Sequence, residues 1–552
     1  ARGRTLQTHG VSVTPTAEAL RRGAAEPAAL TRASVTDPRV VLPVVAIAAV
    51  VGVLVATTRY GIGLTPDSVV YITGARSLAD GRGYTHLDGG AISSWPPGYS
   101  FVLSLGERIG IDALDGAVVL SAVSLVVTVL LTYVLLRRHV RSPGVCAAGV
   151  VVVGCSAVLL EIFSKALSEH LFIPVLLAFI LVCEDLLERP TDLRLFAGAV
   201  LLAWAAFYLR YAGIVTVAIG GLIVLAAGAR SRLGPALLRA GAFAVLAGSL
   251  PVVWMIRNVE AGGDPMGPRA EASFTLASNM RRVANEASQW IATQLAPPAI
   301  RALIGAVVVI ALAGLLVLLF TRRAQVPADW RRIVPLALVV VVYTGYLVAS
   351  ASIVAFGAIN TRFLLPVFVP TVVLAAWLFE KVRDQLRSQK LRTALTLIGV
   401  AWVVVNVMWF AGRAIGYAQD GAGGYASERW ENSALMKDIA LLDTSIPTYS
   451  NDARAVGIFT DKPVQVSVAK TFFNSDSETG HLPDFVRRVE CNGRAQLIWF
   501  LPNGASYLYT LDELREHVQL TPMVERADGV IYEVTPRDPA AVACPGATPV
   551  GG

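Results

Sequence analysis

The chain has 552 residues, of which 55% are hydrophobic and only 16% are charged, and its mean hydropathy is +0.59. A soluble chain keeps about a quarter of its residues charged, so this composition excludes an entirely water-exposed surface and indicates a lipid-exposed one. The net charge of +7 does not indicate nucleic-acid binding, because the arginines lie between apolar runs, where membrane topology explains them.

Residues 1–38 are polar, rich in Ala and Arg, and lack the apolar stretch of a signal peptide. We expect them to form a cytoplasmic N-terminal tail. Abundant Ala, Val, Arg and Gly with few Lys are typical of a GC-rich bacterial genome and favour an actinobacterial source. The expected location is therefore the bacterial inner membrane.

Residues 39–412 contain repeated apolar runs of the length that crosses a bilayer, about 20 residues. They predict an α-helical polytopic domain of about eleven transmembrane helices, with long outer loops at 59–115 and 257–300. The predicted spans are 39–58, 116–136, 143–160, 170–187, 195–209, 212–229, 239–256, 301–320, 333–352, 363–380 and 393–412.

Lys and Arg cluster in alternate short loops, for example at Arg137, Arg138 and Arg141 and again between Lys381 and Arg392. The positive-inside rule assigns these loops to the cytoplasm. Only a cytoplasmic N-terminus satisfies all of the clusters, and it places everything after residue 413 on the outer side.

Residues 413–552 are expected to form a small extracytoplasmic α/β domain. Its predicted elements are strands Pro447–Ser450, Val464–Val468, Ala495–Phe500 and Val530–Val534 and a helix at Leu511–Val518. Cys491 and Cys544 lie in this domain and would form a disulfide if it faces an oxidising compartment. Cys146, Cys155 and Cys183 lie in apolar spans and are interpreted as small core residues.

The predicted spans contain almost no ionisable residues, and polar residues gather at their outer ends. A transporter or flippase is expected to place polar or broken segments near the bilayer midplane. The pattern therefore favours a site at the outer membrane–water interface, which suits a lipid-linked reactant.

Five segments follow one another along the chain in a recognisable order. They are Thr65–Tyr71 (TPDSVVY), Trp95–Tyr99 (WPPGY), Ser164–Glu169 (SKALSE), Asn360–Pro366 (NTRFLLP) and Tyr449–Asp452 (YSND). This series resembles the bacterial GT-C glycosyltransferases, the superfamily of the protein O-mannosyltransferases and the lipid A aminoarabinose transferase. In those proteins an Asp after the first span begins a D-x-x-x-Y helix.

The resemblance implies a GT-C-like fold and an inverting transfer of a sugar from a polyprenyl-phosphate donor, without a cofactor, on the outer face of the membrane. The implied acceptor is a hydroxyl of a cell-envelope glycan, glycolipid or protein, and membrane lipids are further partners. Some relatives use a divalent metal, but the sequence has no dense carboxylate cluster, so no metal site is predicted. The alternatives are a lipid-linked-sugar transporter or flippase and a non-catalytic subunit with the same fold.

Asp67 is the predicted catalytic base, because a carboxylate at the membrane edge can accept the proton of an acceptor hydroxyl. The alternative is that Asp67 caps the helix Ser68–Ala79. Glu169 is the second predicted catalytic carboxylate, which would bind the acceptor or support the base. Its alternative is a helix-end carboxylate that interacts with the helix dipole.

Arg210, Arg257 and Arg362 are predicted on the outer side, against the positive-inside rule, so some partner must hold them there. We expect them to bind the donor phosphate, which guanidinium groups match well. Pairing with a local carboxylate such as Glu260, or contact with lipid headgroups, is the alternative. Lys165 is a further candidate phosphate ligand, unless it only snorkels.

Trp95 and Tyr99 are predicted to stack on a sugar ring, with an interfacial aromatic belt as the alternative. His170 is a candidate substrate ligand or a hydrogen-bonded interface histidine. Arg269 is interpreted as a loop-surface charge.

The predicted orientation can be tested with a reporter fused at residue 430. Because the Lys/Arg clusters place this position outside, a reporter that works only outside the cytoplasm should be active there, and a cytoplasmic reporter should be silent. The reverse result would overturn both the topology and the location of the site.

Overall fold

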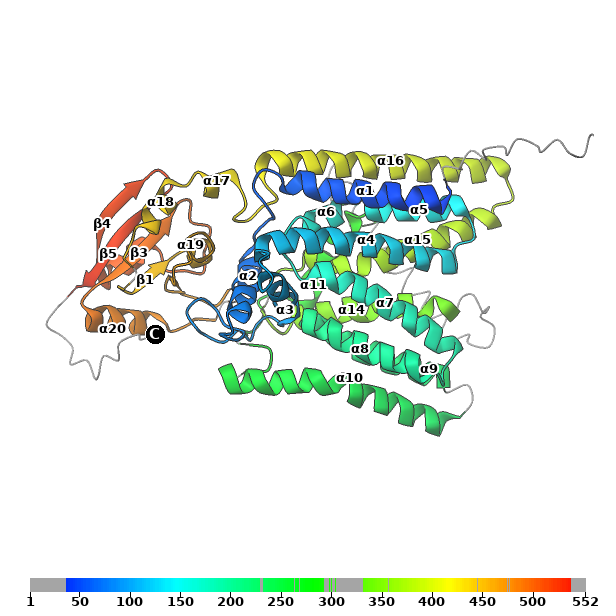
Figure 1. Cartoon of the computed structure of the whole chain (residues 1–552), viewed down its shortest axis with the longest axis horizontal. Helices are drawn as coiled ribbons and strands as arrows, with labels where there is room; N and C mark the ends of the chain where they lie inside the picture. The colour runs from blue at the N-terminus through cyan, green and yellow to red at the C-terminus, as the bar shows by residue number, and fades with distance from the viewer. Residues whose placement is uncertain are drawn as a thin grey trace, which may run out of the picture.

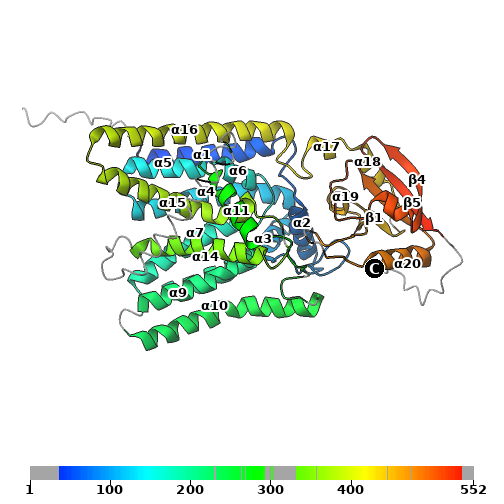
Figure 2. The same ribbon diagram turned by 180° about the vertical axis from the view of Figure 1, so that it is seen from behind.

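The structure, a computed structural model, describes residues 36–228, 232–262, 264–267, 269–291, 331–355, 357–443, 445–473, 475 and 477–537, together with residues 297, 299 and 303. Figures 1 and 2 show a bundle of long helices with a small α/β domain at one end. Helix α2 and helix α3 lie at that same end, between the bundle and the domain.

Within the described residues, nine helical segments are long and apolar enough to cross a membrane. The helices that contribute to them are α1 (Pro38–Thr57), α4 (Ala113–His139), α5 (Pro143–Gly154) with α6 (Ala157–Phe163), α7 (Glu169–Glu188), η1 (Tyr211–Ile214) with α9 (Val215–Gly228), α10 (Leu233–Gly262), α14 (Val334–Ala351), α15 (Thr361–Gln385) and α16 (Gln389–Asp420). A tenth apolar helix, α8 (Leu193–Leu209), is shorter. The chain is therefore a multi-pass membrane protein.

Large apolar side chains face outward on the peripheral helices, as a lipid-facing surface requires. Leu238 of α10 is 76% exposed and Met408 of α16 is 68% exposed. Helices α10 and α16 run along opposite edges of the bundle (Figures 1 and 2). The exposed apolar surface on these helices is what the low charge content predicts.

Ten of the predicted spans coincide with these helices, and the predicted span 301–320 lies outside the described residues apart from residue 303. The predicted tail 1–38 also lies almost wholly outside them. The predicted span 143–160 consists of two helices, because the chain breaks at Cys155 and the hydroxyl of Ser156 accepts a hydrogen bond from the backbone of the next helix, α6. The last predicted span, 393–412, lies within α16, which continues to Asp420 and ends at Gly421 (φ 88°).

The first outer segment forms α2 (Pro66–Ala79) and α3 (Gly98–Glu107). Thr65 is the N-cap of α2: its side chain accepts a hydrogen bond from the backbone of Ser68, while Ser68 accepts one from the backbone of Thr65. Such a reciprocal capping box satisfies two backbone donors that a helix start leaves free. The alternative role of Asp67 as the cap is therefore wrong, and its carboxylate is available for other contacts.

A short extended segment fixes where α2 begins. Gly63 pairs with segment 164–166, which leads into α7, and Leu64 pairs with segment 423–425, which follows α16. Gly424 has a φ of 68°, and a Cβ at this position would lie 1.9 Å from the carbonyl oxygen of Leu64. Only glycine fits such a close approach of two backbones.

The C-terminal domain has a five-stranded sheet in the order β2-β1-β3-β5-β4. Strand β1 is parallel to both of its neighbours, whereas β5 is antiparallel to both of its neighbours, β3 and β4. Its elements are α17 (Glu428–Glu431), α18 (Ala434–Ala440), β1 (Thr448–Ser450), α19 (Ala453–Thr460), β2 (Gln465–Val466), α20 (Leu482–Asn492), β3 (Ala495–Phe500), α21 (Leu511–Arg515), β4 (Val518–Arg526) and β5 (Gly529–Pro536). The predicted small α/β domain is thus present.

Four predicted strands correspond to β1, β2, β3 and β5, but strand β4 was not predicted. The predicted helix at Leu511–Val518 ends at Arg515, and β4 follows it. The sequence does not predict this strand because it contains Pro522, and proline is rare within sheets. It fits here because β4 is the edge strand and has an irregularity between Pro522 and Val524.

Cys491 is disulfide-bonded, and its predicted partner Cys544 lies outside the described residues, so the pairing of these two cysteines stays a prediction. Cys146, Cys155 and Cys183 are buried free thiols, as their places in apolar spans predict.

Candidate active site

Four charged side chains meet at the end of the bundle that faces the C-terminal domain. Asp67 lies in the first turn of α2, Glu169 is the first residue of α7, Arg210 follows the last residue of α8, and Arg362 lies in the first turn of α15. They come from four separate elements, and all four are residues that the sequence singled out. We call them the four-residue cluster.

Arg362 is the centre of the cluster. Its Nη1 atom contacts Oδ2 of Asp67, and its Nε atom donates to Oε1 of Glu169 over 2.6 Å. The same oxygen of Glu169 also contacts Nη1 of Arg210. Two carboxylates thus face two guanidinium groups, and their formal charges cancel.

The four side chains of the cluster differ in their exposure to solvent. The side chain of Glu169 is fully buried, those of Arg210 and Arg362 are 9% and 16% exposed, and that of Asp67 is 29% exposed. A buried charge is tolerated only when it is paired. Pairing therefore explains why Arg210 and Arg362 lie on the predicted outer side, and their partners are Glu169 and Asp67 rather than the suggested Glu260.

Asp67 is the member of the cluster that is open to a reactant. Only its Oδ2 atom is bound by Arg362, and within the described residues its Oδ1 atom accepts no hydrogen bond. One oxygen is therefore held in place and the other is free to accept a proton. A positioned general base requires this combination.

A row of aromatic side chains lies behind the cluster. The hydroxyl of Tyr71 lies 3.1 Å from that of Ser168, and the rings of Tyr71 and Tyr99 meet edge to face with centroids 5.3 Å apart. The hydroxyl of Tyr99 lies 3.4 Å from Nδ1 of His170. Burial raises the pKa of Tyr71 to about 12, so the phenol stays neutral.

Tyr99 and His170 are both fully buried. They present no face to a sugar in this structure, which favours for His170 the alternative of a hydrogen-bonded histidine in the interior. For Tyr99 the position favours packing against Tyr71 over stacking on a substrate.

Arg257 and Arg269 have no carboxylate partner within the described residues, unlike the two arginines of the cluster. Nη1 of Arg257 donates to the carbonyl of Ile92 over 2.9 Å, and its guanidinium lies 4.8 Å from the ring centroid of Trp254. Nη2 of Arg269 donates to the carbonyl of Ser94 over 3.2 Å. Arg269 is exposed, and it lies close enough to Asp67 for the two charges to interact.

The buried side-chain amide of Asn258 connects the segments around Arg257 by hydrogen bonds. Nδ2 of Asn258 donates to the hydroxyl of Tyr211 and to the carbonyl of Pro265, each over 2.9 Å, and Tyr211 donates to the carbonyl of Ser93 over 2.5 Å. Asn258 and Tyr211 were not predicted as site residues. The only sequence signal was their place beside Arg257 and Arg210 at the outer ends of apolar runs.

The remaining predicted ligands lie at the edge of the region. Nζ of Lys165, in the extended segment after α6, lies 3.4 Å from Oε1 of Glu161, and within the described residues no ion pair or hydrogen bond joins Lys165 to the four-residue cluster. The half-buried Trp95 has the guanidinium of Arg454 5.8 Å from its ring centroid and the ring of His86 6.5 Å away. Trp95 therefore lies between the first outer segment and the C-terminal domain and contacts both.

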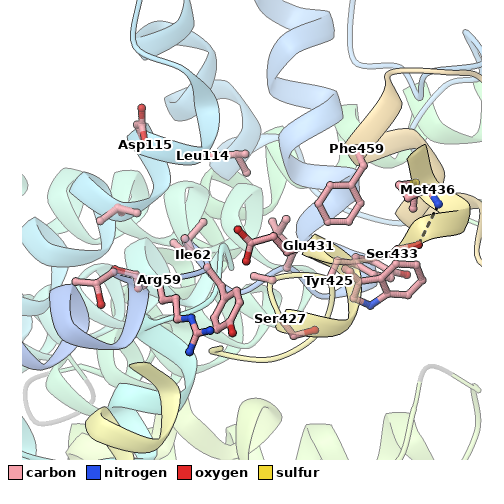
Figure 3. Close-up of a pocket in the computed structure, with 18 of the residues that line it drawn as sticks. Arg59, Ile62, Leu114, Asp115, Tyr425, Ser427, Glu431, Ser433, Met436 and Phe459 are labelled. Atoms are coloured by element: carbon pink, nitrogen blue, oxygen red, sulfur yellow. Dashed lines mark hydrogen bonds between the residues drawn. The ribbon is translucent and has the colours of Figure 1, made fainter. Parts of the chain in front are cut away.

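Within the described residues no group of three or more His, Cys, Asp or Glu side chains could hold a metal ion. A cavity of about 910 Å³ lies beside α1 and α4 (Figure 3), and its lining reaches Leu64 but includes no member of the cluster. The chemistry that the cluster supports is therefore assigned to Asp67 and its surroundings and not to this cavity.

Comparisons with known proteins identify the fold. No protein-family model matches the chain, and no curated protein matches it. Two solved structures of ArnT from Cupriavidus metallidurans do: the apo state, with a TM-score of 0.54, and the state bound to undecaprenyl phosphate, with a TM-score of 0.53. Each has 12% sequence identity, covering 89% of this chain and 97% of the other.

ArnT is the lipid A aminoarabinose transferase, a GT-C superfamily glycosyltransferase. The GT-C-like fold that the five motifs predicted is therefore confirmed. At 12% identity the likeness concerns the fold alone. A further match, with a TM-score of 0.48, is the Archaeoglobus fulgidus oligosaccharyltransferase in complex with Zn and sulfate, at 12% identity over 88% of this chain and 72% of the other.

The charge balance of the cluster gives a stability prediction. Glu169→Gln leaves two guanidinium groups facing the single carboxylate of Asp67, and breaking a buried ion pair from one side costs about 3–5 kcal/mol. Arg210→Met in the same chain should recover part of that loss, because one uncompensated charge is removed as well. Thermal unfolding of the two single variants and the double variant in detergent measures this coupling.

Arg487→Met is the matched control, because its pair with Asp484 on α20 is exposed and such pairs contribute at most about 1 kcal/mol. Strictly additive effects of Glu169→Gln and Arg210→Met would show that the two residues are not energetically paired.

Proposed function

We propose that this chain is an inverting membrane glycosyltransferase that moves a sugar from a polyprenyl-phosphate donor to a hydroxyl group on the outer face of the bacterial inner membrane. The observation that carries the proposal is the arrangement around Asp67. One oxygen of this partly exposed carboxylate is held by Arg362, and the other accepts no hydrogen bond from the part of the chain that the structure describes. The fold shared with ArnT, which has been solved with undecaprenyl phosphate, supports a lipid-phosphate donor.

The donor phosphate is assigned to Arg257 and Arg269. A phosphate needs positive charge that is not already neutralised, and Arg210 and Arg362 are paired with carboxylates. Among the described residues, the hydrogen bonds and ring contacts of Arg257 and Arg269 go to carbonyl groups, an amide and an aromatic ring, and neither guanidinium forms an ion pair with a carboxylate. We therefore propose that Arg362 and Arg210 hold Asp67 and Glu169 in place, instead of binding phosphate as the sequence predicted.

The chemical step follows from these positions. The acceptor oxygen attacks the anomeric carbon of the sugar and forms the new glycosidic bond, while the bond from that carbon to the phosphate oxygen breaks. The proton of the acceptor hydroxyl goes to Oδ1 of Asp67, and the electron pair of the broken bond leaves with the polyprenyl phosphate. Because phosphate leaves as a stable anion, one base together with nearby positive charge is sufficient.

Glu169 is a positioning residue in this scheme. It is fully buried and contacts Arg210 and Arg362, so it orients the guanidinium that holds Asp67. The acceptor class, which the resemblance leaves as a glycan, a glycolipid or a protein, does not enter the step.

The position of the cluster also weighs against a flippase. Its members lie where α2, α7 and α15 begin and where α8 ends, not halfway along a helix. A carrier is expected to hold its polar site near the bilayer midplane. A non-catalytic subunit is the other alternative, and it is tested by the loss of activity on changing Asp67.

Asp67→Asn should lower the rate of sugar transfer by about 10²–10⁴-fold, because a positioned general base contributes that much. Folding should be kept, since Thr65 and not Asp67 caps α2, and Glu169 still neutralises Arg362 when Asp67 loses its charge. The measurement is transfer of radiolabel from a panel of polyprenyl-phosphate-linked sugars to a bacterial envelope extract. Asp88→Asn, in the same outer segment but with its carboxylate on the local turn at Gly90, is the control and should stay near the wild-type rate. A near wild-type rate for Asp67→Asn would defeat the proposed mechanism.

Arg257→Gln and Arg269→Gln should weaken donor binding, each by about tenfold, because each loses a charge-assisted hydrogen bond to phosphate worth about 1.5–3 kcal/mol. Binding of undecaprenyl phosphate to the protein in nanodiscs measures this directly. Arg281→Gln, at an exposed position of α11 (Leu276–Ser288), serves as the control and should leave binding unchanged. Equal affinities for all three variants would remove Arg257 and Arg269 from the donor site.

A further inference from the structure

Helix α19 is the part of the C-terminal domain that lies beside α2 (Figures 1 and 2). Asp461, which follows α19, pairs with Arg76 of α2 over 3.3 Å. The guanidinium of Arg454, in the first turn of α19, lies 5.8 Å from the ring centroid of Trp95. The ring of His86 approaches the same tryptophan edge to face, with centroids 6.5 Å apart. The C-terminal domain and the first outer segment therefore meet around Trp95.

The guanidinium of Arg454 has hydrogen-bond donors that the protein does not use. It is half-buried, and within the described residues it forms no ion pair and donates no hydrogen bond. The charge of Asp452 is near, but Oδ1 of this carboxylate accepts a hydrogen bond from the hydroxyl of Tyr425 over 2.6 Å. By contrast, Nε and Nη2 of Arg526 in the same domain both donate to Asp438. The planar fork of Arg454 is therefore available to the two oxygens of a carboxylate or phosphate.

His86 adds a neutral polar group beside this guanidinium. Burial lowers the pKa of His86, the charge of Asp88 opposes this effect, and the charge of Arg454 adds to it. The imidazole is therefore neutral at pH 7, and it can donate or accept a hydrogen bond without adding a second positive charge.

Aromatic rings continue from Trp95 onto the surface of the C-terminal domain. Burial raises the pKa of Tyr507, and the charge of Arg454 acts in the opposite direction, so the phenol and the guanidinium are neighbours. The rings of Tyr507 and Phe473 meet edge to face with centroids 5.5 Å apart, and Phe473 is 61% exposed. The C–H face of a sugar ring packs on such aromatic side chains, which bury large apolar areas. Rings beside a guanidinium with unused donors therefore match a saccharide that carries an anionic group.

Trp95 also connects this surface to the candidate active site. The carbonyl of the preceding residue, Ser94, accepts a hydrogen bond from Nη2 of Arg269 over 3.2 Å. Arg269 is one of the two arginines assigned to the donor phosphate, and its charge interacts with that of Asp67. Because neighbouring Cα atoms are about 3.8 Å apart, a molecule bound at Trp95 lies next to the place proposed for the donor.

We infer that Arg454 binds the anionic group of an acidic saccharide, and that this saccharide is the acceptor of the transfer reaction. Its sugar rings pack on Trp95, Tyr507 and Phe473. The inference rests on the proposed function, and it narrows the acceptor from any hydroxyl compound to a sugar that carries a carboxylate or a phosphate. Arg454 holds the acceptor and takes no part in the bond-forming step, in which the proton goes to Asp67.

The test is binding of the full-length protein, in fluorescent nanodiscs and without donor, to an array of bacterial saccharides. The array contains each saccharide in a neutral, a carboxylate-bearing and a phosphate-bearing form, so it also distinguishes the two sources of negative charge. The wild-type protein should bind one of the acidic forms at least tenfold more tightly than its neutral counterpart. This preference is expected because a guanidinium forms charge-assisted hydrogen bonds with an anion.

Arg454→Gln should lower binding of the acidic form about tenfold, and Arg454→Lys should recover part of the loss, because lysine keeps the charge but not the fork. Phe473→Ser should also weaken binding, and folding should be kept because this ring is largely exposed. Arg488→Gln is the matched control. Arg488 lies exposed on α20, lacks a carboxylate partner among the described residues, and donates there to Gln465 over 3.3 Å.

Binding of undecaprenyl phosphate to Arg454→Gln in nanodiscs should equal that of the wild type. A weakened affinity would place Arg454 in the donor site and overturn the inference. Equal binding of neutral and acidic saccharides, no binding to any saccharide of the array, or wild-type binding by Arg454→Gln would overturn it as well. None of these measurements uses sugar transfer, so a failure of the saccharide site is distinguishable from a failure of the proposed function.

Discussion

Arg362, in the C-terminal half of the membrane bundle, lies between two carboxylates from its N-terminal half, and the arrangement of the bundle end that faces the C-terminal domain depends on these contacts. Asp67 is 295 residues away in the chain and Glu169 is 193 residues away. In a region withdrawn from water, a guanidinium without these partners would carry a large desolvation cost. The starts of α2, α7 and α15 are therefore held together by charge balance in addition to apolar packing, and Arg210 extends the same balance to the end of α8.

Much of the fold was predictable from the sequence, because apolar runs predict the membrane-spanning helices and the basic residues between them predict their orientation. The residues of the cluster were also found, since charges at the outer ends of spans need an explanation. Their pairing was not, because nothing in the sequence indicates which of several distant carboxylates reaches Arg362. The contact of Arg269 with the carbonyl of Ser94 was not predictable for a related reason, because a loop has no periodicity and the contact exists only in the folded chain.

The separation of charged groups at the outer end has a chemical meaning. The neutralised pairs lie deep, while the arginines without carboxylate partners lie along the segment from Ile92 to Ser94. The neutralised pairs fix the positions of the side chains around them. The arginines near Ile92 to Ser94 remain able to attract an anion. A lipid phosphate is confined to the membrane surface, so a site at this level meets it without drawing it through the bundle. The position of the cluster thus fits a reaction between one lipid-anchored partner and one partner that approaches from water.

The extended segment at Gly63 and Leu64 has a mechanical consequence. Its backbone is hydrogen-bonded on one side to the residues that lead into α7 and on the other to the first residues after α16, and α2 begins immediately after it. A displacement of the C-terminal domain would therefore pull on the same few peptide units that position Asp67. Through this backbone segment, a movement of the C-terminal domain changes the position of Asp67, although no side chain of the domain takes part in the proposed chemistry.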